Sequence, residues 1–158
     1  MIHPKERPII DLHKNECTGN LNNATSTLNI SMKNVFKNVG NHPTKDLRIR
    51  VGGCESSKPQ NIKNFSDVTA ANNLNPGTDF NNEIKLSIPV SISGGTVSLP
   101  QLELIIYVRL SYKSAWRRFG RTWIDEVYLS YIVGHSSAAH ATISQRDAIR
   151  TYVRKIYS

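Results

Sequence analysis

The residues best suited to acid–base chemistry are two histidines in the segment Gly134–His140. His135 and His140 stand five positions apart in a loop rich in serine and alanine. Two imidazoles can serve as general base and general acid in phosphodiester cleavage, while an arginine stabilises the developing negative charge. Such a close pair in a small-residue loop is more often structural. A small ribonuclease using His135 and His140 is therefore the third of three functional hypotheses, and we do not expect an enzyme.

Metal and cofactor sites are not indicated by the sequence. Cys17 and Cys54 are the two cysteines, and neither belongs to a Cys-x-x-Cys pair or lies near a histidine at ligand spacing. The histidine pair also lacks the i, i+4 spacing of a helical zinc pair. The glycine pairs Gly52-Gly53 and Gly94-Gly95 resemble turns rather than phosphate-binding loops. The sequence predicts no catalytic residue, no metal and no cofactor.

A segment that interleaves arginines with aromatic side chains is the strongest candidate for binding. It runs from Lys113 to Trp123. Guanidinium groups beside aromatic rings suit phosphate contact, base stacking or insertion among lipid headgroups. The alternative is that Trp116, Phe119 and Trp123 are core residues beneath a solvated cationic face. The candidate anion-binding residues here are Lys113, Arg117, Arg118 and Arg121.

A second cationic surface is predicted at the C-terminus. Four further candidates for anion binding occur there: Arg146, Arg150, Arg154 and Lys155. Their spacing sets like charges side by side on a helix, which costs a few tenths of a kilocalorie per mole for each pair. A bound anion would relieve that repulsion, although a solvated face is the plainer interpretation. Arg48 and Arg50 can join the surface only if their face of a strand is exposed.

Length and charge limit the class of protein. The chain has 158 residues, a formal net charge of +8 and a sequence pI near 9.7. One domain is expected at this length. The charge favours nucleic acid, an anionic membrane surface or an acidic partner, unless it serves only solubility. The first residues have no apolar signal region and no run reaches membrane-spanning length, so we expect an intracellular protein without a transmembrane segment.

Alternating apolar residues predict strands that would position these side chains. The alternation covers residues 28–32, 47–51, 84–92, 97–99, 102–112 and 127–133. The stretch 84–99 should form a hairpin around Gly94-Gly95. Residues 102–112 are apolar along one face, and Ile105 and Tyr107 make the centre of the other face apolar too, so this strand should be covered on both sides.

Helices are expected in three places. The clearest is at the C-terminus, with Ser144 as N-cap and Asp147 near the N-terminal dipole. Others are predicted from Ser114, with the tryptophans on one face, and over Ser66–Asn72. The fold class is α+β, an antiparallel β-sheet with two or three helices. We expect an extended N-terminal arm over residues 1–20 and a single β-rich domain over 21–158, irregular in its polar first half.

The N-terminal arm carries an apolar cluster that needs a place to bury. Proline keeps the segment extended. The arm could dock on its own domain or on a neighbouring copy, which would link subunits into an array. The candidate self-association residues are Pro8, Ile9, Ile10 and Leu12.

The order of features resembles a rhabdovirus-type matrix protein over about half of the chain. The resemblance rests on the basic strand Leu47–Val51, followed by the stretch Phe65-Ser66-Asp67-Val68-Thr69-Ala70-Ala71, a long alternating strand and a helical C-terminus. It implies a non-enzymatic protein that self-associates, condenses ribonucleoprotein and binds the inner membrane leaflet. The chain departs from that family in having no lysine-rich N-terminal tail and no Pro-Pro-x-Tyr motif.

Three functions follow from these observations. The first is a viral-type structural protein of the virion that self-associates and binds an anionic membrane or ribonucleoprotein. The second is a nucleic-acid-binding module without an assembly role, or a coat protein. The third is the ribonuclease. The expected partners are a second copy of the chain, nucleic acid and an anionic membrane surface.

Overall fold

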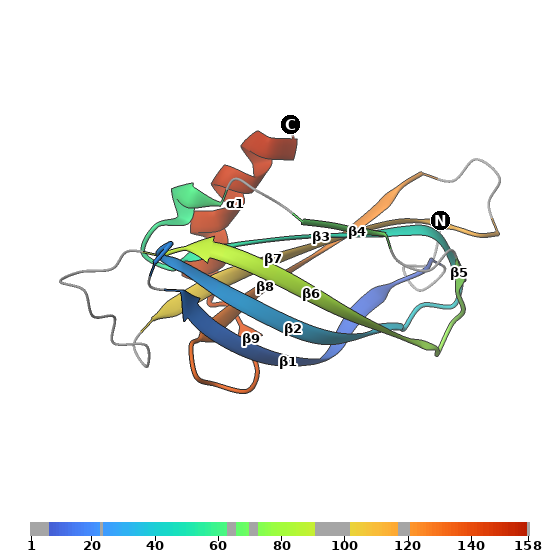
Figure 1. Cartoon of the computed structure of the whole chain (residues 1–158). Helices are drawn as coiled ribbons and strands as arrows, with labels where there is room; N and C mark the ends of the chain where they lie inside the picture. The colour runs from blue at the N-terminus through green and yellow to red at the C-terminus, as the bar shows by residue number, and fades with distance from the viewer. Residues whose placement is uncertain are drawn as a thin grey trace.

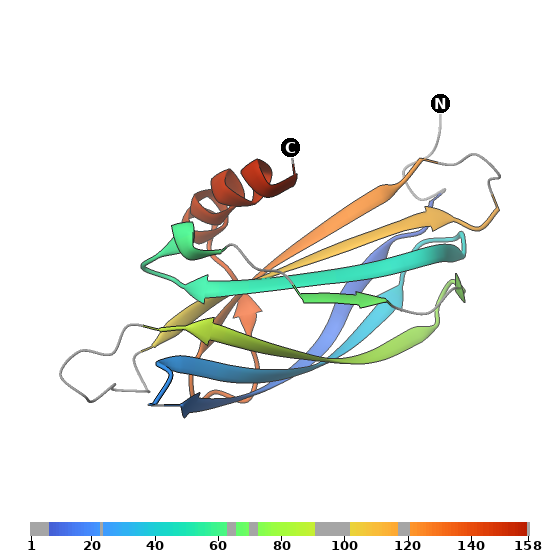
Figure 2. The same cartoon turned by 45° about the horizontal axis from the view of Figure 1, so that its top comes forward.

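Two antiparallel sheets packed face to face, with a C-terminal helix outside one of them, make up the fold (Figures 1 and 2). The structure is a computed structural model that describes residues 7–22, 24–62, 66–69, 73–90, 102–116 and 121–157. For residues 66–69 and 157 it describes the backbone. The coarse prediction of an antiparallel β-fold with a helix at the C-terminus is confirmed.

Sheet A has three strands in the order β1-β2-β6. These are β1 (Ile10–Asn22), β2 (Thr27–Asn38) and β6 (Asp79–Pro89). The predicted strands at 28–32 and 84–92 lie in β2 and β6, although residues 91–101, with the predicted Gly94-Gly95 turn, lie outside the described part of the chain. The first half was expected to be irregular, and this was wrong. Polar side chains on the solvent face of β1 hide its strand pattern.

Sheet B has the order β4-β3-β7-β8-β9, with β5 also paired to β3. Its strands are β3 (Thr44–Glu55), β4 (Ser66–Thr69), β5 (Asn73–Leu74), β7 (Glu103–Ser114), β8 (Trp123–Ile132) and β9 (Ala139–His140). The strands predicted at 47–51, 102–112 and 127–133 all fall within it.

The core lies between the sheets and is filled by alternate residues of the facing strands. On β7 the inward side chains include Leu104, Ile106 and Val108, all fully buried. Ile105 and Tyr107 point the other way and are also buried, beneath the C-terminal helix. The prediction that this strand is covered on both faces is confirmed for its first half, whereas Arg109 and Ser111 lie beyond the helix and are partly exposed.

Helix α1 (Ile143–Tyr157) covers one half of the outer face of sheet B (Figures 1 and 2). Ile149 and Val153 pack there against residues from β3, β7 and β8 and against Ile62, which follows the short helix η1 (Pro59–Asn61). Thr142 caps the helix. Its Oγ1 accepts the Gln145 amide at 3.2 Å, while Gln145 Oε1 accepts the Thr142 amide at 3.0 Å.

The capping prediction was therefore wrong by two residues. Ser144 lies inside the first turn, because Thr142 and Gln145 form a reciprocal capping pair that Ser144 cannot make. Asp147 consequently lies beyond the first turn, which contains no acidic residue.

The two other predicted helices were also wrong. Ser114 ends β7 and Trp123 begins β8, and Tyr112 stands opposite Trp123 in the ladder. Ser66–Thr69 forms β4, which pairs with Arg48–Val51. In both places the hydrogen bonds of a neighbouring strand outweigh a helical spacing of apolar residues.

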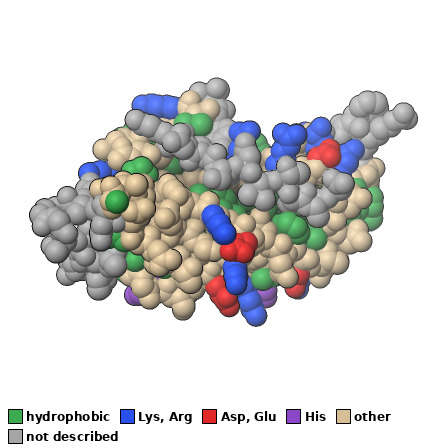
Figure 3. Space-filling model, viewed as in Figure 1, with side chains coloured by type: hydrophobic (Ala, Val, Ile, Leu, Met, Phe, Trp, Pro, Cys, Tyr) green, Lys and Arg blue, Asp and Glu red, His purple; other side chains and the backbone are tan. Residues whose placement is uncertain are grey.

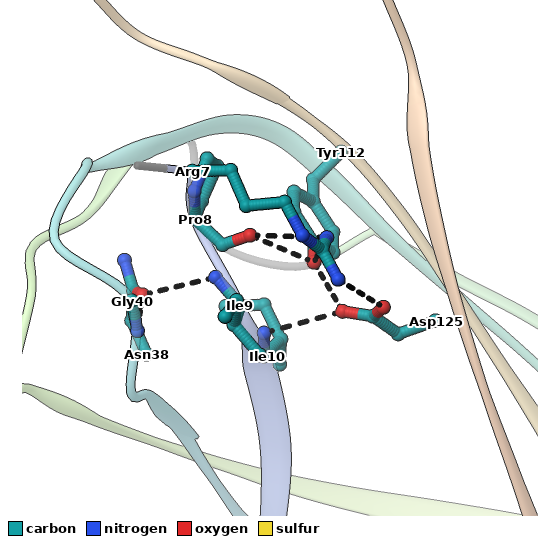
Figure 4. A network of polar contacts seen from close by, with 8 residues as sticks. All are labelled: Arg7, Pro8, Ile9, Ile10, Asn38, Gly40, Tyr112 and Asp125. Atoms are coloured by element: carbon teal, nitrogen blue, oxygen red, sulfur yellow. Dashed lines mark hydrogen bonds and ion pairs between the residues drawn. The ribbon is translucent and has the colours of Figure 1, made fainter. Parts of the chain in front are cut away.

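An N-terminal strap, residues Arg7–Ile9, closes the sandwich where β1 begins (Figure 4). Arg7 lies 3.6 Å from the Asp125 carboxylate, and the Ile10 amide donates to the same side chain at 3.3 Å. The Tyr112 hydroxyl also bonds to Asp125 and lies 3.2 Å from the Pro8 carbonyl. These contacts join the start of sheet A to β7 and β8 of sheet B.

Close backbone approach fixes the other side of the strap. The Val39 amide donates to the Ile9 carbonyl at 2.8 Å. A Cβ atom on Gly40 would lie 2.1 Å from the Arg7 carbonyl oxygen, so only glycine fits there. Farther along β1, Asn15 exchanges two hydrogen bonds with Ala138, at 3.1 and 2.7 Å. The start and the middle of β1 are thus tied to the chain around β8.

Candidate anion-binding surface

The half of sheet B that α1 leaves uncovered presents cations on its outer face. Alternation along β3 and β7 buries Ile49, Val51, Val108 and Leu110, so the residues between them point outward. In Figure 3, Lys and Arg side chains gather over β3, β4, β7 and β8. We call this surface the basic face; it comprises Lys45, Arg48, Arg50, Arg109 and Lys113.

Two pairs of like charge stand in register across the basic face. Arg50 is the cross-strand partner of Arg109, and Lys45 is the partner of Lys113. Residues directly opposite in an antiparallel pair have Cβ atoms about 4.5–5.5 Å apart, and like charges at that separation destabilise the sheet. The register of β3 and β7 therefore brings these four cations close together.

Acidic residues border this surface on its two sides. Glu126 stands opposite Arg109 on β8, and the backbone of Asp67 stands opposite Arg50 on β4. Glu126 Oε2 accepts the Tyr107 hydroxyl at 2.5 Å and the Tyr128 hydroxyl at 3.2 Å. Acidic residues therefore occupy the ladder positions on both sides of the Arg50–Arg109 pair, and one of them, Glu126, is engaged by tyrosines.

Burial keeps the tyrosine donors of this network protonated. Desolvation raises the pKa of Tyr107 well above its ordinary value, and the hydrogen bond to Glu126 raises it further. Desolvation also raises the pKa of Tyr128. Arg109 Nη1 lies 3.4 Å from the Tyr107 hydroxyl, which fixes the guanidinium at the border of the basic face.

The predicted C-terminal cations lie on α1, beside the basic face. Arg150 lies over the Tyr128 ring at 5.8 Å, and its pKa is raised by its hydrogen bond to Tyr128. Arg146 contacts Asp147 at 3.8 Å, and Lys155 lies 5.6 Å from the Tyr152 ring centroid. Arg154 is exposed. These four therefore extend the cationic surface over α1.

The two tryptophans of the predicted binding segment have different environments. Trp116 is 67% exposed at the turn after β7, whereas Trp123 packs against the core. The guanidinium of Arg121 lies 3.8 Å from the Trp123 ring, and that of Arg7 lies 4.6 Å from it. Of the predicted cations Lys113 belongs to the basic face, Arg121 stacks on Trp123, and Arg117 and Arg118 lie outside the described residues.

The predicted self-association residues contact their own chain. Pro8 and Ile10 are buried, and Ile9 and Leu12 are half-buried, with Leu12 against the core. Of the two docking places left open by the sequence, the structure has the arm on its own domain. From Ile10 onward the predicted arm is strand β1.

The candidate catalytic histidines are both exposed, on different elements. His135 follows the turn after β8, and His140 lies in β9 opposite Leu129. Within the described ranges no cluster of three His, Cys, Asp or Glu side chains could hold a metal. Both cysteines are buried free thiols, and desolvation raises their pKa values to about 11 for Cys17 and about 12 for Cys54. The ribonuclease hypothesis stays a prediction.

Two residues of the basic face were missed from the sequence. Lys45 precedes a bulge at Asp46, where φ is +55°, so simple alternation does not reach it. Arg109 lies between Val108 and Leu110, and the alternation of that strand was sufficient to place it outward. Arg48 and Arg50 lie on the outer face of β3, so the condition for their joining the cationic surface is met.

Comparisons with known proteins give likeness of fold alone. No family model matches the chain, and no curated protein matches its sequence. A crystal structure of the ApaA protein from Bordetella pertussis is similar with a TM-score of 0.52 and 11% identity, covering 84% of this chain and 100% of that one. A β-glucuronidase from Parabacteroides merdae matches with a TM-score of 0.38 and 14% identity, over 75% of this chain and 13% of the enzyme.

The comparisons do not test the matrix-like role, which stays a prediction. Among the residues that the structure describes, no helix combines the length and apolar character needed to cross a membrane.

Proposed function

We propose that the protein is a non-enzymatic module that binds nucleic acid through the basic face of sheet B. The observation that carries the proposal is the pair of like-charge rows, Arg50 with Arg109 and Lys45 with Lys113, in register on adjacent strands. Phosphates placed over such rows would turn a repulsive arrangement into an attractive one, with release of condensed counterions.

The distribution of apolar side chains favours nucleic acid over a membrane. The large hydrophobic residues exposed in the described part of the chain are Val39, Trp116, Ile124, Ile143 and Ile156. They lie on a loop, a turn, strand β8 and the two ends of α1, so they do not form one apolar face beside the cations. A protein that inserts at a lipid interface presents such a continuous apolar face.

The test compares two lysine pairs that point out of opposite sheets. Lys45→Gln with Lys113→Gln removes two charges from the basic face, and Lys33→Gln with Lys85→Gln removes two from the outer face of sheet A. Affinity for a labelled RNA is measured by fluorescence anisotropy over a salt series. The sheet B variant should bind about three- to tenfold more weakly, with the slope of log K against log salt reduced by about 0.7 for each lysine on a single strand.

The sheet A variant is the matched control, because the residue type and the charge removed are the same. It should bind within about twofold of the wild type. Equal losses in the two variants would mean that net charge, rather than the basic face, attracts RNA. Binding to vesicles containing phosphatidylserine, with no binding to RNA at low salt, would overturn the proposal in favour of a membrane ligand.

A further inference from the structure

An exposed aromatic side chain lies at one end of the basic face. Trp116 follows directly after β7 and is the most exposed large aromatic residue described. Its ring lies against His42, with centroids 4.6 Å apart and planes inclined by 40°. An indole exposed to 67% in a basic environment costs hydrophobic free energy unless a ligand covers it.

Backbone and hydroxyl contacts hold the turn that carries this indole at the end of β7. The Ala115 amide donates to the Pro43 carbonyl at 2.9 Å, which joins the turn after β7 to the loop before β3. The Trp116 amide lies 3.4 Å from Ser114 Oγ, and the same hydroxyl lies 3.4 Å from His42 Nδ1. Ser114 and Thr44 are register partners next to Lys113 and Lys45. The turn that carries the aromatic pair is therefore fixed at the end of the ladder that positions the cations.

The spacing of the cations along β7 suits an extended strand. Arg109, Ser111 and Lys113 project from the same face, and alternate residues of a strand are about 6.8 Å apart. A single nucleic acid strand laid along this row would meet a cation, a hydroxyl and a second cation before it reaches Trp116. Its bases are free to stack, whereas the bases of a duplex are already stacked inside the helix.

We infer that the nucleic acid is single-stranded and that Trp116, backed by His42, stacks on one of its bases while the phosphates lie along Arg109 and Lys113. The inference rests on the proposed function and adds the class of ligand. Trp123 has no such role, because it packs against the core and carries the guanidinium groups of Arg7 and Arg121.

The experiment uses the full chain and measures Trp116→Ala and Trp116→Phe against single-stranded oligouridylate and an RNA duplex of equal length. Trp116→Ala should weaken single-strand binding on the order of tenfold, because it removes one stacking contact. It should leave duplex binding and the salt slope unchanged. Trp116→Phe should recover most of the loss. Far-ultraviolet circular dichroism checks that each variant is folded.

Tryptophan fluorescence gives a second readout. Oligouridylate should quench the emission of the wild type and of Trp123→Phe, in which Trp116 is the remaining tryptophan. It should leave the emission of Trp116→Phe unchanged, although that variant still binds. Quenching that persists in Trp116→Phe, or equal single-strand and duplex binding by wild type and Trp116→Ala, would overturn the inference while the proposed function stands. Absence of RNA binding by the wild type would overturn the proposed function itself.

Discussion

On the outer face of sheet A the ladder pairs charges of opposite sign, whereas on the outer face of sheet B two pairs of cations also stand opposite each other. Lys33 of β2 has Glu16 of β1 on one side and Glu83 of β6 on the other. Figure 3 shows this row as alternating basic and acidic side chains that cross β6, β2 and β1, below the cluster of cations on sheet B. Both faces use the same strand alternation, so the difference lies in the choice of charged residue alone.

Sheet A shows how the chain makes a solvated surface. Ser31 donates to Glu83 at 2.9 Å and Ser87 donates to Asn29 at 2.7 Å, so its polar groups are satisfied within the sheet. A hollow of about 410 Å³ on this sheet is lined by both lysine and glutamate. Cross-strand pairs of this kind stabilise a sheet, whereas the like pairs of sheet B work against it. The comparison teaches that the basic face is specific to one sheet and is not a general property of a basic protein.

The largest expected effect distinguishes the half of sheet B that α1 covers from the outer face of sheet A, which no described helix covers. Ile149 is 1% exposed beneath α1. Ile149→Ala should lower the free energy of unfolding by about 2–5 kcal/mol, because it leaves a cavity between the helix and the sheet. Chemical denaturation measures the change. Val35→Ala, on the half-buried outer side of β2, is the control and should cost less than about 1 kcal/mol. Equal losses would mean that α1 does not stabilise sheet B.

A smaller effect is expected from the ionisation of the two buried thiols, which lie in different regions of the core. Cys17 lies between the sheets, and Cys54 lies under α1. Their pKa values are raised from 9.0 to about 11 and about 12, chiefly by desolvation. The unfolded chain therefore loses these protons first, so their contribution to stability is complete below pH 9 and declines as the pH rises through about 11 and about 12.

Denaturant midpoints measured from pH 8 to pH 11 test this expectation. The free energy of unfolding of the wild type should fall above pH 9. The free energy of unfolding of Cys17→Ala should fall less steeply, because one of the two thiols that ionise in the unfolded chain but stay protonated in the folded chain is absent. Buried tyrosines also contribute to the wild-type slope, so the difference between the two proteins is the informative quantity. Parallel curves would show that Cys17 is as accessible when folded as when unfolded.

The smallest effect is expected from two variants that each give one sheet the charge pairing of the other. Lys113→Glu places a carboxylate opposite Lys45 and should stabilise the fold by about 0.2–1 kcal/mol, while RNA binding weakens. Glu83→Lys places two lysines opposite each other on sheet A and removes the bond from Ser31, so it should destabilise the fold by a similar amount. Thermal unfolding gives the sign of each change. A loss of stability in Lys113→Glu would remove the argument that like charges are costly on the basic face.

Much of the fold could be predicted from the alternation of apolar residues, because a strand with one face buried in the core shows this pattern. Leu47, Ile49 and Val51 identified β3, and the doubly apolar stretch 102–112 identified β7. Strand β1 could not be found in this way, because between Leu12 and Leu21 only Cys17 is buried. Its place depends on pairing with β2 and on bonds to Asp125 and Ala138, which are more than 100 residues away.

The candidate site was predictable only in part. Sequence patterns found the cations and the aromatic residues, but a helix was predicted between Ser114 and Trp123, which are the last residue of β7 and the first residue of β8. Helical spacing placed Trp116 and Trp123 on one face, whereas in the ladder Trp123 turns inward and Trp116 remains at the turn. The pairing of Lys45 with Lys113 depends on the bulge at Asp46, and the local sequence pattern does not predict that bulge.

The N-terminal strap can form its contacts only late in the synthesis of the chain. The hydrogen bond that fastens it joins Ile10 to Asp125 across 115 residues of chain. At a translation rate of about 5–20 residues per second, Ile10 waits on the order of 10 s before its partner has been synthesised. Throughout that interval sheet B lacks β8, to which the strap is fastened. The strap is thus among the last parts of the fold to be secured, and the rate of translation sets how long it stays unfastened.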